Sequence, residues 1–251
     1  MNRLSSPLVK EPVLSLSKEG LGGICFFPAA GSLKFPLSQK GKLISAQLAA
    51  LVSSLLFLFL QCPALAAAPV VLVVGDSLSA AYGLQEKDGW VNLLRERLAK
   101  QSPHYDVVNA SISGDTTRGG LTRIDAALIE HKPSVVIIEL GGNDGLRGLS
   151  LDATHNNLDA MIAKATAARA KLLIVGVELP PNYGATYTRQ FAESFESVAK
   201  KYKVPLVPSL LAGFGEQREL FQTDGIHPIA SAQPMMMETV WKELKPLVRA
   251  R

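Results

Sequence analysis

The sequence predicts an α/β fold, in which one three-layer domain is built on a parallel sheet of about five strands with helices on both faces. From Pro69 onward, short apolar runs alternate with longer segments of helical period, which is the pattern of a parallel sheet wrapped by helices. The apolar runs are rich in Val, Ile and Leu, as strands buried on both faces should be. No internal repeat and no linker divides residues 69–251, so we expect a single domain there.

The individual elements follow from these runs and from the breaks between them. The candidate strands cover residues 70–74, 106–110, 135–140, 172–177 and, with a weaker pattern, 205–207. The candidate helices cover residues 89–101, 120–131, 153–170, 187–203 and 232–248. In the first helix, Val91, Leu94 and Leu98 recur at the spacing of one helical face, which we expect to pack on the sheet. Pro103 and Pro133 lie in connections, where helix breakers belong.

The composition describes a globular chain with an electrically neutral body. Of the 251 residues, 47% are hydrophobic and 19% are charged, which is typical of folded proteins. The formal charge of +4 arises upstream of residue 67, which six of the 26 basic and two of the 22 acidic residues precede. The remaining chain carries 20 residues of each sign, so its charge gives a nucleic-acid partner no support.

Residues 40–68 have the composition of a secretory signal peptide. Lys40 and Lys42 precede a largely apolar run over residues 43–60, and an alanine-rich site follows. A positive flank, an apolar stretch and a small-residue site together predict export with cleavage near residues 66–68, and hence a periplasmic or secreted protein. A retained membrane anchor is the alternative, since 18 residues are near the shortest length that spans a bilayer.

The residues around this segment favour cleavage. Pro63 and the alanines follow the apolar run where a stop-transfer segment would carry charges, so we expect no stable membrane anchor after processing. Lipid attachment at Cys62 is disfavoured, because the bulky Gln61 precedes it. Both cysteines, Cys25 and Cys62, lie before the cleavage point, so the mature domain has no disulfide. Residues 1–39, rich in Pro, Gly and Ser, are predicted to be an upstream extension without packed structure.

Unusual polar loops follow the first three candidate strands. They cover residues 75–79, 113–117 and 141–145. In an open parallel sheet, ligands bind beyond the carboxyl ends of the strands. Connectivity alone therefore places all three loops on one edge of the sheet, which is where we expect the functional site.

Ser77 is the candidate nucleophile. Gly75 permits a tight exit from the strand, and Ser77 is predicted to stand at a helix entrance with its hydroxyl exposed. The alternative is that Ser77 only caps that helix, as serine often does. A serine that attacks a substrate needs a base, and the base needs an orienting acceptor.

Among the four histidines, His227 stands out because Asp224 precedes it by three residues in a non-helical turn. Gly225 lets the chain fold tightly there, and Pro228 biases His227 toward extended backbone. The spacing would bring the Asp224 carboxylate near Nδ1 of His227, which leaves Nε2 free to take a proton. A plain Asp-Gly turn is the alternative, and it would be favoured if Ser77 were absent.

Gly114 and Asn143 are the candidate donors of an oxyanion hole. Gly114 offers a backbone N–H unobstructed by a side chain, Asn143 offers a side-chain amide, and the N–H of Ser77 supplies a third donor. Such donors act because they already point to where charge develops. Gly-Asn-Asp clusters are more often plain turns, but this one shares a sheet edge with the two other loops, which favours a functional role.

Motifs of several other enzyme classes are missing from the sequence. No Gly-x-Ser-x-Gly elbow occurs, which argues against the usual α/β-hydrolase arrangement. There is also no His-Glu-x-x-His, no Walker A loop and no Gly-x-Gly-x-x-Gly after a strand. The sequence therefore gives metal, nucleotide and dinucleotide sites no support.

The polar blocks, in this order, resemble those of the SGNH (GDSL-like) hydrolase family. The blocks are residues 75–79, Gly114, residues 141–144 and residues 224–227. The initials of the family correspond here to Ser77, Gly114, Asn143 and His227. The likeness extends, over essentially all of residues 69–251, to the bacterial periplasmic subgroup named thioesterase I, protease I and lysophospholipase L1, or arylesterase.

This resemblance implies a flavodoxin-like fold and the hydrolysis of acyl esters, which include aryl esters, acyl-CoA thioesters and lysophospholipids. It also implies that no metal and no organic cofactor takes part. On the family's pattern, Ser77 is the nucleophile that forms an acyl-enzyme, His227 is the base and Asp224 orients it, while Gly114 and Asn143 complete the oxyanion hole.

The loops also contain candidates for substrate binding. Leu146 and Pro181 are predicted to line an apolar acyl groove, although Leu146 would serve equally as core at a helix start. Arg147 would meet a phosphate or carboxylate of the substrate, or else lie in solvent. We expect the partner to be a small-molecule acyl ester or thioester and the protein to be a monomer.

Two other functions are alternatives at this point. A carbohydrate O-acetylesterase of the same fold would want polar groups where Leu146 and Leu149 stand. A non-catalytic periplasmic binding module would not need Ser77, Asp224 and His227 together.

Overall fold

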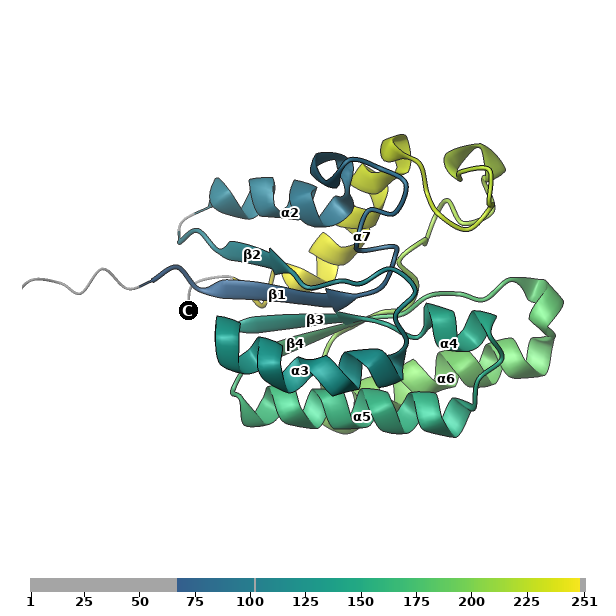
Figure 1. Ribbon diagram of the computed structural model, residues 1–251, viewed down its shortest axis with the longest axis horizontal. Coiled ribbons are helices and arrows are strands. Elements are labelled where there is room, and N and C mark those ends of the chain that lie inside the picture. The colour runs from purple at the N-terminus through teal and green to yellow at the C-terminus, as the bar shows by residue number, and fades with distance from the viewer. Residues whose placement is uncertain (1–66, 102, 249–251) are drawn as a thin grey trace, which may run out of the picture. The chain divides into compact units, whose positions relative to one another are not determined.

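The computed structural model describes residues 67–101 and 103–248, and within them the chain forms a sheet of five parallel strands (Figure 1). The strands are β1 (Val70–Gly75), β2 (Asp106–Asn109), β3 (Val135–Glu139), β4 (Lys171–Val175) and β5 (Leu206–Val207). Their order across the sheet is β2-β1-β3-β4-β5. This is the strand order of the flavodoxin-like fold, so the predicted fold class is confirmed.

Helices connect the strands, and every α-helix except one overlaps a predicted helical segment. The α-helices are α2 (Trp90–Ala99), α3 (Thr117–His131), α4 (Gly142–Leu146), α5 (Leu151–Ala167), α6 (Ala185–Tyr202) and α7 (Gln233–Leu244). The short 3-10 helices are η1 (Glu86–Asp88), η2 (Pro181–Tyr183), η3 (Arg218–Leu220) and η4 (Ala230–Ala232). The exception is α4, which the sequence predicts as a loop, because five residues that include two glycines show no apolar period.

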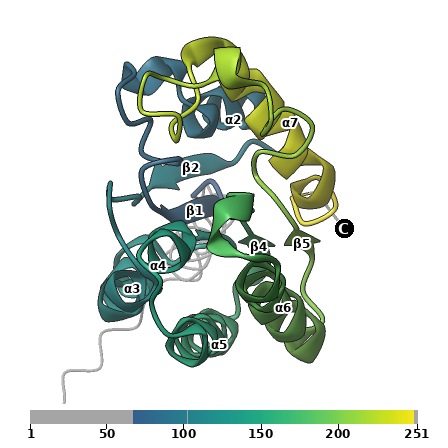
Figure 2. The same ribbon diagram turned by 90° about the vertical axis from the view of Figure 1, so that its right-hand side faces the viewer.

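The helices form two outer layers around the sheet (Figure 2). One face is covered by α2 and α7, and the other by α3, α5 and α6. Side chains alternate along β3: Ile137 packs in the cluster that contains Leu94 of α2, whereas Val136 and Ile138 pack in the cluster that contains Leu158 of α5. All five side chains are fully buried, and burial of each stabilises the fold by about 1.5–3 kcal/mol.

The segment after β1 differs from the prediction, because no helix begins at Ser77. Residues 77–83 form consecutive turns, with a bond of 3.2 Å from the N–H of Tyr82 to the carbonyl of Ser77. Ala81 has a φ of +57° and Gly83 a φ of +73°, and such left-handed values do not continue a right-handed helix. The alternative in which Ser77 is a helix cap is therefore wrong.

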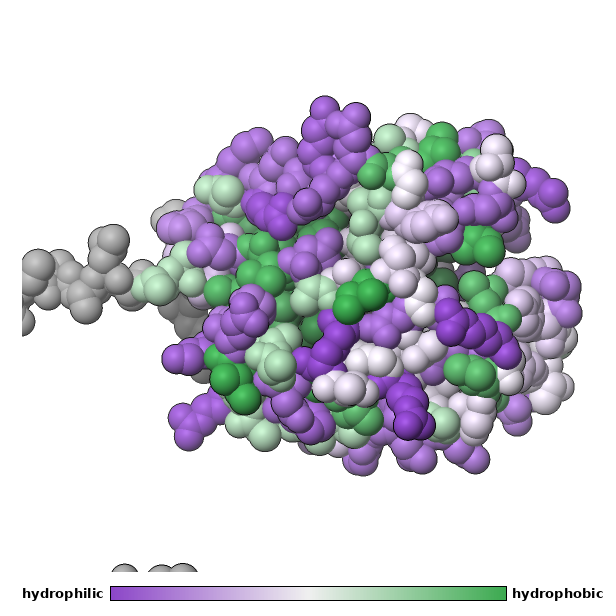
Figure 3. Space-filling model, viewed as in Figure 1, coloured by the Kyte–Doolittle hydropathy of each residue, from purple (hydrophilic) through white to green (hydrophobic). Residues whose placement is uncertain are grey.

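The surface visible in the space-filling view is mainly hydrophilic, with hydrophobic patches scattered between the polar side chains (Figure 3). Within residues 67–101 and 103–248, no helix is both long and apolar enough to cross a membrane. The extension at residues 1–39 and the apolar run at residues 43–60 lie outside the described residues. The signal peptide and the anchor alternative therefore stay predictions.

Candidate active site

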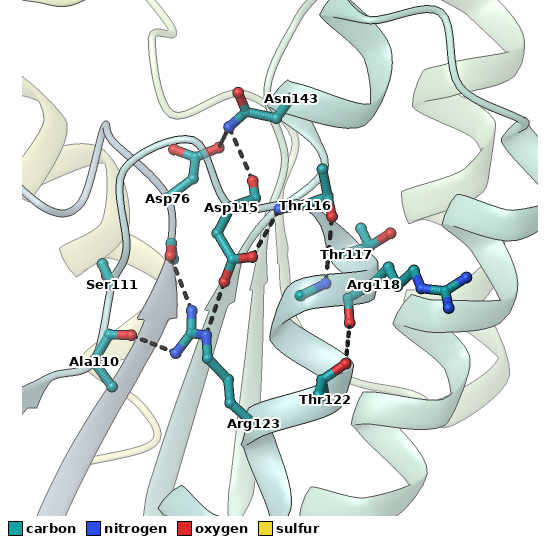
Figure 4. A network of polar contacts seen from close by, with 12 residues as sticks. Asp76, Ala110, Ser111, Asp115, Thr116, Thr117, Arg118, Thr122, Arg123 and Asn143 are labelled. Carbon is teal, nitrogen blue, oxygen red and sulfur yellow. Dashed lines mark hydrogen bonds and ion pairs between the residues drawn. The ribbon is translucent and has the colours of Figure 1, made fainter.

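The three polar loops meet at the carboxyl ends of β1, β2 and β3, on the right-hand side of the sheet in Figure 1. Asn143, at the start of α4, joins all three. Its Nδ2 donates to the carbonyl of Asp115 at 2.9 Å and to Oδ2 of Asp76 at 3.2 Å (Figure 4). The prediction that these loops share one edge is confirmed.

Ser77, His227 and Asp224 form a continuous chain of hydrogen bonds. The hydroxyl oxygen of Ser77 lies 2.8 Å from Nε2 of His227, although 150 residues separate them. Nδ1 of His227 lies 2.7 Å from Oδ2 of Asp224. The structure thus brings together the three residues that the sequence predicts as nucleophile, base and orienting acid.

The loop of residues 221–228, here the His227 loop, is closed on itself. Phe221 and Pro228 form an isolated antiparallel bridge, and the N–H of Gln222 donates to the carbonyl of His227 at 2.7 Å. Between them, Gly225 has a φ of +68°, a left-handed value that favours glycine. This backbone fixes the direction in which the imidazole points.

The Asp224 carboxylate is held in its ionised form. Its Oδ1 accepts hydrogen bonds from the N–H groups of His227 at 3.0 Å and of Ile226 at 2.9 Å. The bond from the His227 N–H, above all, lowers the pKa of Asp224 to about 2, and the side-chain bond to His227 adds to it. An ionised acceptor at Nδ1 holds the imidazole proton there, so that Nε2 presents a lone pair to the Ser77 hydroxyl.

Two neighbours of His227 give no signal in the sequence. The ring of Tyr82 lies against the imidazole, with centroids 4.4 Å apart and the planes inclined by 37°. Nε2 of Gln222 donates to the carbonyl of Tyr82 at 2.8 Å and to that of Pro228 at 3.3 Å. Gln222 therefore ties the His227 loop to the turns that carry Ser77. Residues of these types are common in surface loops, so only the contact itself identifies them.

The backbone N–H groups of Ser77 and Gly114 are available to a ligand, since neither donates a hydrogen bond to another residue in the described part of the chain. Gly114 has a φ of +80°, and an added Cβ would find its nearest atom, on Arg147, at 3.7 Å. Backbone conformation rather than crowding therefore requires glycine at this position.

The side-chain amide of Asn143 is held by two acceptors at once. Nδ2 carries two hydrogens, and the Asp115 carbonyl and the Asp76 carboxylate take them both. These bonds orient the amide at the sheet edge. An oxyanion that binds to Nδ2 must share or displace one of them, and the bond to Asp76 is the longer of the two.

Arg147 contacts both candidate oxyanion residues. Its Nη2 lies 2.9 Å from the carbonyl oxygen of Gly114 and 3.4 Å from Oδ1 of Asn143. The contact with Oδ1 helps to fix which way the Nδ2 hydrogens point. The sequence gives no signal of this role, because it depends on the approach of two loops that are 33 residues apart.

Two buried carboxyl groups lie behind Ser77. Oε2 of Glu139 accepts from the hydroxyl of Ser79 at 2.6 Å and from the N–H of Asp76 at 3.4 Å. Burial raises the pKa of Glu139, and the Asp76 carboxyl raises it further. Burial also raises the pKa of Asp76, to about 6, against the lowering effect of the bonds from Leu78 and Asn143. Among residues 67–101 and 103–248, no three His, Cys, Asp or Glu side chains are grouped to hold a metal ion.

Asp144 anchors α4 to the neighbouring helices. Its carboxylate accepts from the N–H of Thr117 at 2.9 Å, from the Thr117 hydroxyl at 2.6 Å and from the Thr154 hydroxyl at 3.3 Å. The side chain is buried. Because Asp144 follows Asn143 directly, these bonds to α3 and α5 also hold the backbone from which the Asn143 side chain extends.

Tyr183 links the segments that contain Leu146 and Pro181, the predicted residues of an acyl groove. The Tyr183 hydroxyl donates to the carbonyl of Leu146 at 2.8 Å, and Pro181 begins η2, which contains Tyr183. Leu146 is half-buried and Pro181 is exposed. A polar hollow of about 570 Å³ lies elsewhere, lined by residues of α5 and α6 such as His155 and Ser197. The acyl groove stays a prediction.

Known proteins resemble this chain over most of its described length. Residues 73–233 match the GDSL-like Lipase/Acylhydrolase family. The esterase TesA of Pseudomonas aeruginosa is 53% identical over 183 residues, which make up 73% of this chain and 91% of that protein. The thioesterase 1/protease 1/lysophospholipase L1 of Escherichia coli K12 is 41% identical over 193 residues, 77% of this chain and 91% of that protein. A crystal structure of TesA, at 52% identity, aligns with a TM-score of 0.70 over 71% of this chain and 99% of its own.

Proposed function

The chain belongs to the GDSL-like lipase/acylhydrolase family, and from that premise we propose that it hydrolyses acyl esters and thioesters with Ser77 as the nucleophile. The observation that carries the proposal is the chain of bonds from Ser77 through His227 to Asp224, with distances of 2.8 Å and 2.7 Å. A serine with a structural role alone would not need a histidine nitrogen at hydrogen-bond distance, itself oriented by an ionised carboxylate.

In the first half of the proposed reaction, Nε2 of His227 takes the hydroxyl proton of Ser77. At the same time the Ser77 oxygen bonds to the carbonyl carbon of the substrate. The imidazolium that forms is stabilised by the Asp224 carboxylate at Nδ1. When the tetrahedral intermediate collapses, the bond to the leaving group breaks, and His227 gives its proton to the departing oxygen or sulfur. The acyl group is then an ester of Ser77.

In the second half, water takes the place of the alcohol or thiol. His227 removes a proton from the water, the resulting oxygen bonds to the acyl carbon, and the bond to Ser77 breaks. Ser77 regains its proton from His227, and the carboxylic acid leaves. His227 carries every proton transfer in this cycle.

The negative charge that develops on the carbonyl oxygen would be met by the N–H groups of Ser77 and Gly114 and by Nδ2 of Asn143. The two backbone donors have no partner among the described residues, and Asn143 is held in place by Asp76 and Asp115. Donors fixed before the reaction need no reorganisation, and the loss of one typically lowers the rate by about 10²–10³.

The substrate we propose is a small molecule with an apolar acyl chain. Four large apolar side chains in or next to the loops of the site are exposed: Tyr82, Ile112, Leu149 and Ile226. Apolar side chains around a few fixed polar groups are typical of sites for acyl substrates. They favour an acyl ester over a carbohydrate O-acetyl ester, and Leu146 and Pro181 would extend this apolar surface.

The cellular setting is part of the proposal. Residues 40–68 support export and cleavage, which would leave the mature enzyme in the periplasm or outside the cell. All the groups that the reaction uses come from a single chain, so a monomer would be sufficient.

The test of the function is Ser77→Ala, which should abolish hydrolysis of a p-nitrophenyl ester and labelling by a fluorophosphonate while the unfolding temperature stays near that of the wild type. Ser197→Ala is the matched control, because it removes another serine hydroxyl that lies 3.2 Å from a histidine nitrogen, on His155. The control should retain both properties. Near-wild-type turnover by Ser77→Ala would refute the assignment.

Substrate class needs a second measurement. Rates for p-nitrophenyl esters and acyl-CoAs of increasing chain length should rise beyond the acetyl group if the apolar surface binds the acyl chain. A carbohydrate O-acetylesterase would instead act best on acetyl esters.

A further inference from the structure

Arg123, in the second turn of α3, donates hydrogen bonds to three acceptors at the edge of the sheet, one at the end of β1 and two in the connection between β2 and α3 (Figure 4). Its Nε lies 2.8 Å from Oδ2 of Asp115, and its Nη2 lies 3.2 Å from the carbonyl oxygen of Gly75. Its Nη1 donates to the carbonyl of Ala110. The Arg123 side chain is only 22% exposed, and that of Asp115 only 12%, so this ion pair is largely shielded from solvent.

The bond to Gly75 connects Arg123 with the nucleophile. Gly75 is the last residue of β1 and stands two positions before Ser77. The same Gly75 carbonyl also accepts from the N–H of Ile112 at 3.0 Å, in the loop after β2. With the bond to Ala110, which follows β2, Arg123 joins the exits of both strands.

The bond to Asp115 connects Arg123 with the oxyanion donors. Asp115 follows Gly114 directly, so the position of Asp115 fixes the peptide bond that leaves Gly114. The carbonyl of Asp115 accepts from Nδ2 of Asn143 at 2.9 Å. Displacement of Asp115 would therefore move both Gly114 and the acceptor that orients Asn143.

Only arginine suits this arrangement. The three acceptors come from two connections and lie around one planar group, and a guanidinium presents five N–H donors in a fixed fork. The ammonium of a lysine is a single point of charge, which can reach one or two of these oxygens but does not span all three.

We propose that Arg123 is a positioning residue for acyl transfer, which holds the loop of Ser77 and the oxyanion donors Gly114 and Asn143 at fixed mutual distances without touching a reacting atom. The inference rests on the proposed function. A misplacement of about 1 Å at a reacting group lowers a rate by about 10²-fold. Arg123→Ala should therefore lower kcat by about 10²-fold, with little change in KM, because no contact with the acyl group is lost.

The experiment compares kcat and KM for a p-nitrophenyl ester in the full-length protein and in three variants: Arg123→Ala, Arg123→Lys and Arg95→Ala. Arg95 is the matched control, because its Nε also donates to a carbonyl of β2, that of Val107 at 3.2 Å, but on α2 and away from the loops of the site. We expect a large loss of kcat in Arg123→Ala, a smaller loss in Arg123→Lys, and wild-type kcat in Arg95→Ala.

A second readout separates positioning from a general loss of structure. Free guanidinium chloride at millimolar concentration should restore part of the kcat of Arg123→Ala, since the ion can occupy the site between the three oxygens. The same salt should leave the wild type and Arg95→Ala unchanged. If Arg123→Ala does not fold, as judged by circular dichroism, Arg123→Lys is the variant on which the loss of kcat at unchanged KM is decided.

The outcomes are distinguishable. A folded Arg123→Ala with wild-type kcat, an equal loss of kcat in Arg95→Ala, or a loss that guanidinium does not relieve would overturn the role of Arg123 while the proposed function stands. Absence of hydrolysis and of fluorophosphonate labelling in the wild type would overturn the proposed function, and this inference with it.

Discussion

The ring of Tyr82 packs against the imidazole of His227, with 4.4 Å between the ring centroids. Tyr82 comes from the turns after β1 and His227 from the loop before α7, so the contact joins the two segments that keep the Ser77 hydroxyl 2.8 Å from Nε2. Half of the tyrosine surface, 51%, is exposed. Tyr82 thus shields one side of the imidazole without belonging to the core.

Tyr82→Ala should therefore lower kcat/KM. Aromatic pairs contribute about 0.5–1.5 kcal/mol beyond their burial, which corresponds to roughly two- to tenfold in rate if the contact is used to hold the imidazole. Tyr82→Phe keeps the ring and should retain nearly full activity. Steady-state kinetics with a p-nitrophenyl ester test this prediction. Equal kcat/KM values for Tyr82→Ala and the wild type would show that the ring contact does not hold the His227 imidazole in place.

Gln222→Ala should also lower kcat, because it removes the hydrogen bond that ties the His227 loop to the Tyr82 carbonyl and a second one, to the Pro228 carbonyl, within that loop. Each bond contributes about 0.5–1.5 kcal/mol, so we expect a fall in kcat of roughly tenfold. The control is Gln217→Ala, in which a glutamine loses a hydrogen bond of 3.1 Å to the Gly213 carbonyl, a residue outside the His227 loop. Comparable kcat values in the two variants would contradict the proposed tie.

Asp224→Asn should lower kcat by about 10⁴-fold, since an amide at this position no longer holds the imidazole proton at Nδ1. The pKa of Asp224 is lowered to about 2, so its folded-state interactions are present above the unfolded pKa of about 3.9 and are lost as the pH falls toward 2. Protonation of Asp224 should thus not limit activity above about pH 3. A pH–rate profile checks this. A fall in activity that follows the titration of Asp224 at a pH above about 3 would contradict it.

Glu139→Gln should reduce the dependence of stability on pH. Burial raises the pKa of Glu139, and that of Asp76 to about 6, so the folded state holds these protons more tightly than the unfolded chain. The stabilisation is complete below the unfolded pKa values, about 4, and is lost as the pH rises through the folded ones. The unfolding temperature of the wild type should fall across this window, and that of Glu139→Gln should fall less, because only Asp76 still contributes.

Melting curves measured from about pH 4.5 to about pH 8 test this expectation. Glu196→Gln, a change at an exposed glutamate of α6, serves as the control and should follow the wild type. A curve for Glu139→Gln that is parallel to that of the wild type would show that Glu139 carries no shifted proton.

The fold was accessible from the sequence because its signals are local. The strands are runs of buried Val, Ile and Leu, and the helices between them have one apolar face, as at Leu94 and Leu98. The parallel connectivity then places Ser77, Gly114 and Asn143 on one edge without any knowledge of distances. The hydrogen-bonded arrangement of Ser77, His227 and Asp224 was also accessible, since Asp224 and His227 lie only three residues apart and share a tight turn.

The supporting residues were not accessible, for a common physical reason. Arg123, Gln222 and Glu139 act through contacts across 48, 140 and 60 residues of sequence, and no local pattern encodes such pairs. The prediction of a helix at Ser77 was wrong because Ala81 adopts a left-handed φ of +57°. Alanine rarely has this conformation, so the sequence does not indicate it. Short α4 escaped prediction because two of its five residues are glycine.

The separation of 150 residues between Ser77 and His227 has a consequence for the nascent chain during synthesis. The strands β1, β2 and β3, with all the groups that would meet the oxyanion, are complete before residue 147, whereas the base belongs to the last quarter of the sequence. On the proposed mechanism, a chain that ends before His227 has the oxyanion donors but no base. We therefore expect that such a chain does not hydrolyse esters until the segment that contains His227 has been added and has folded.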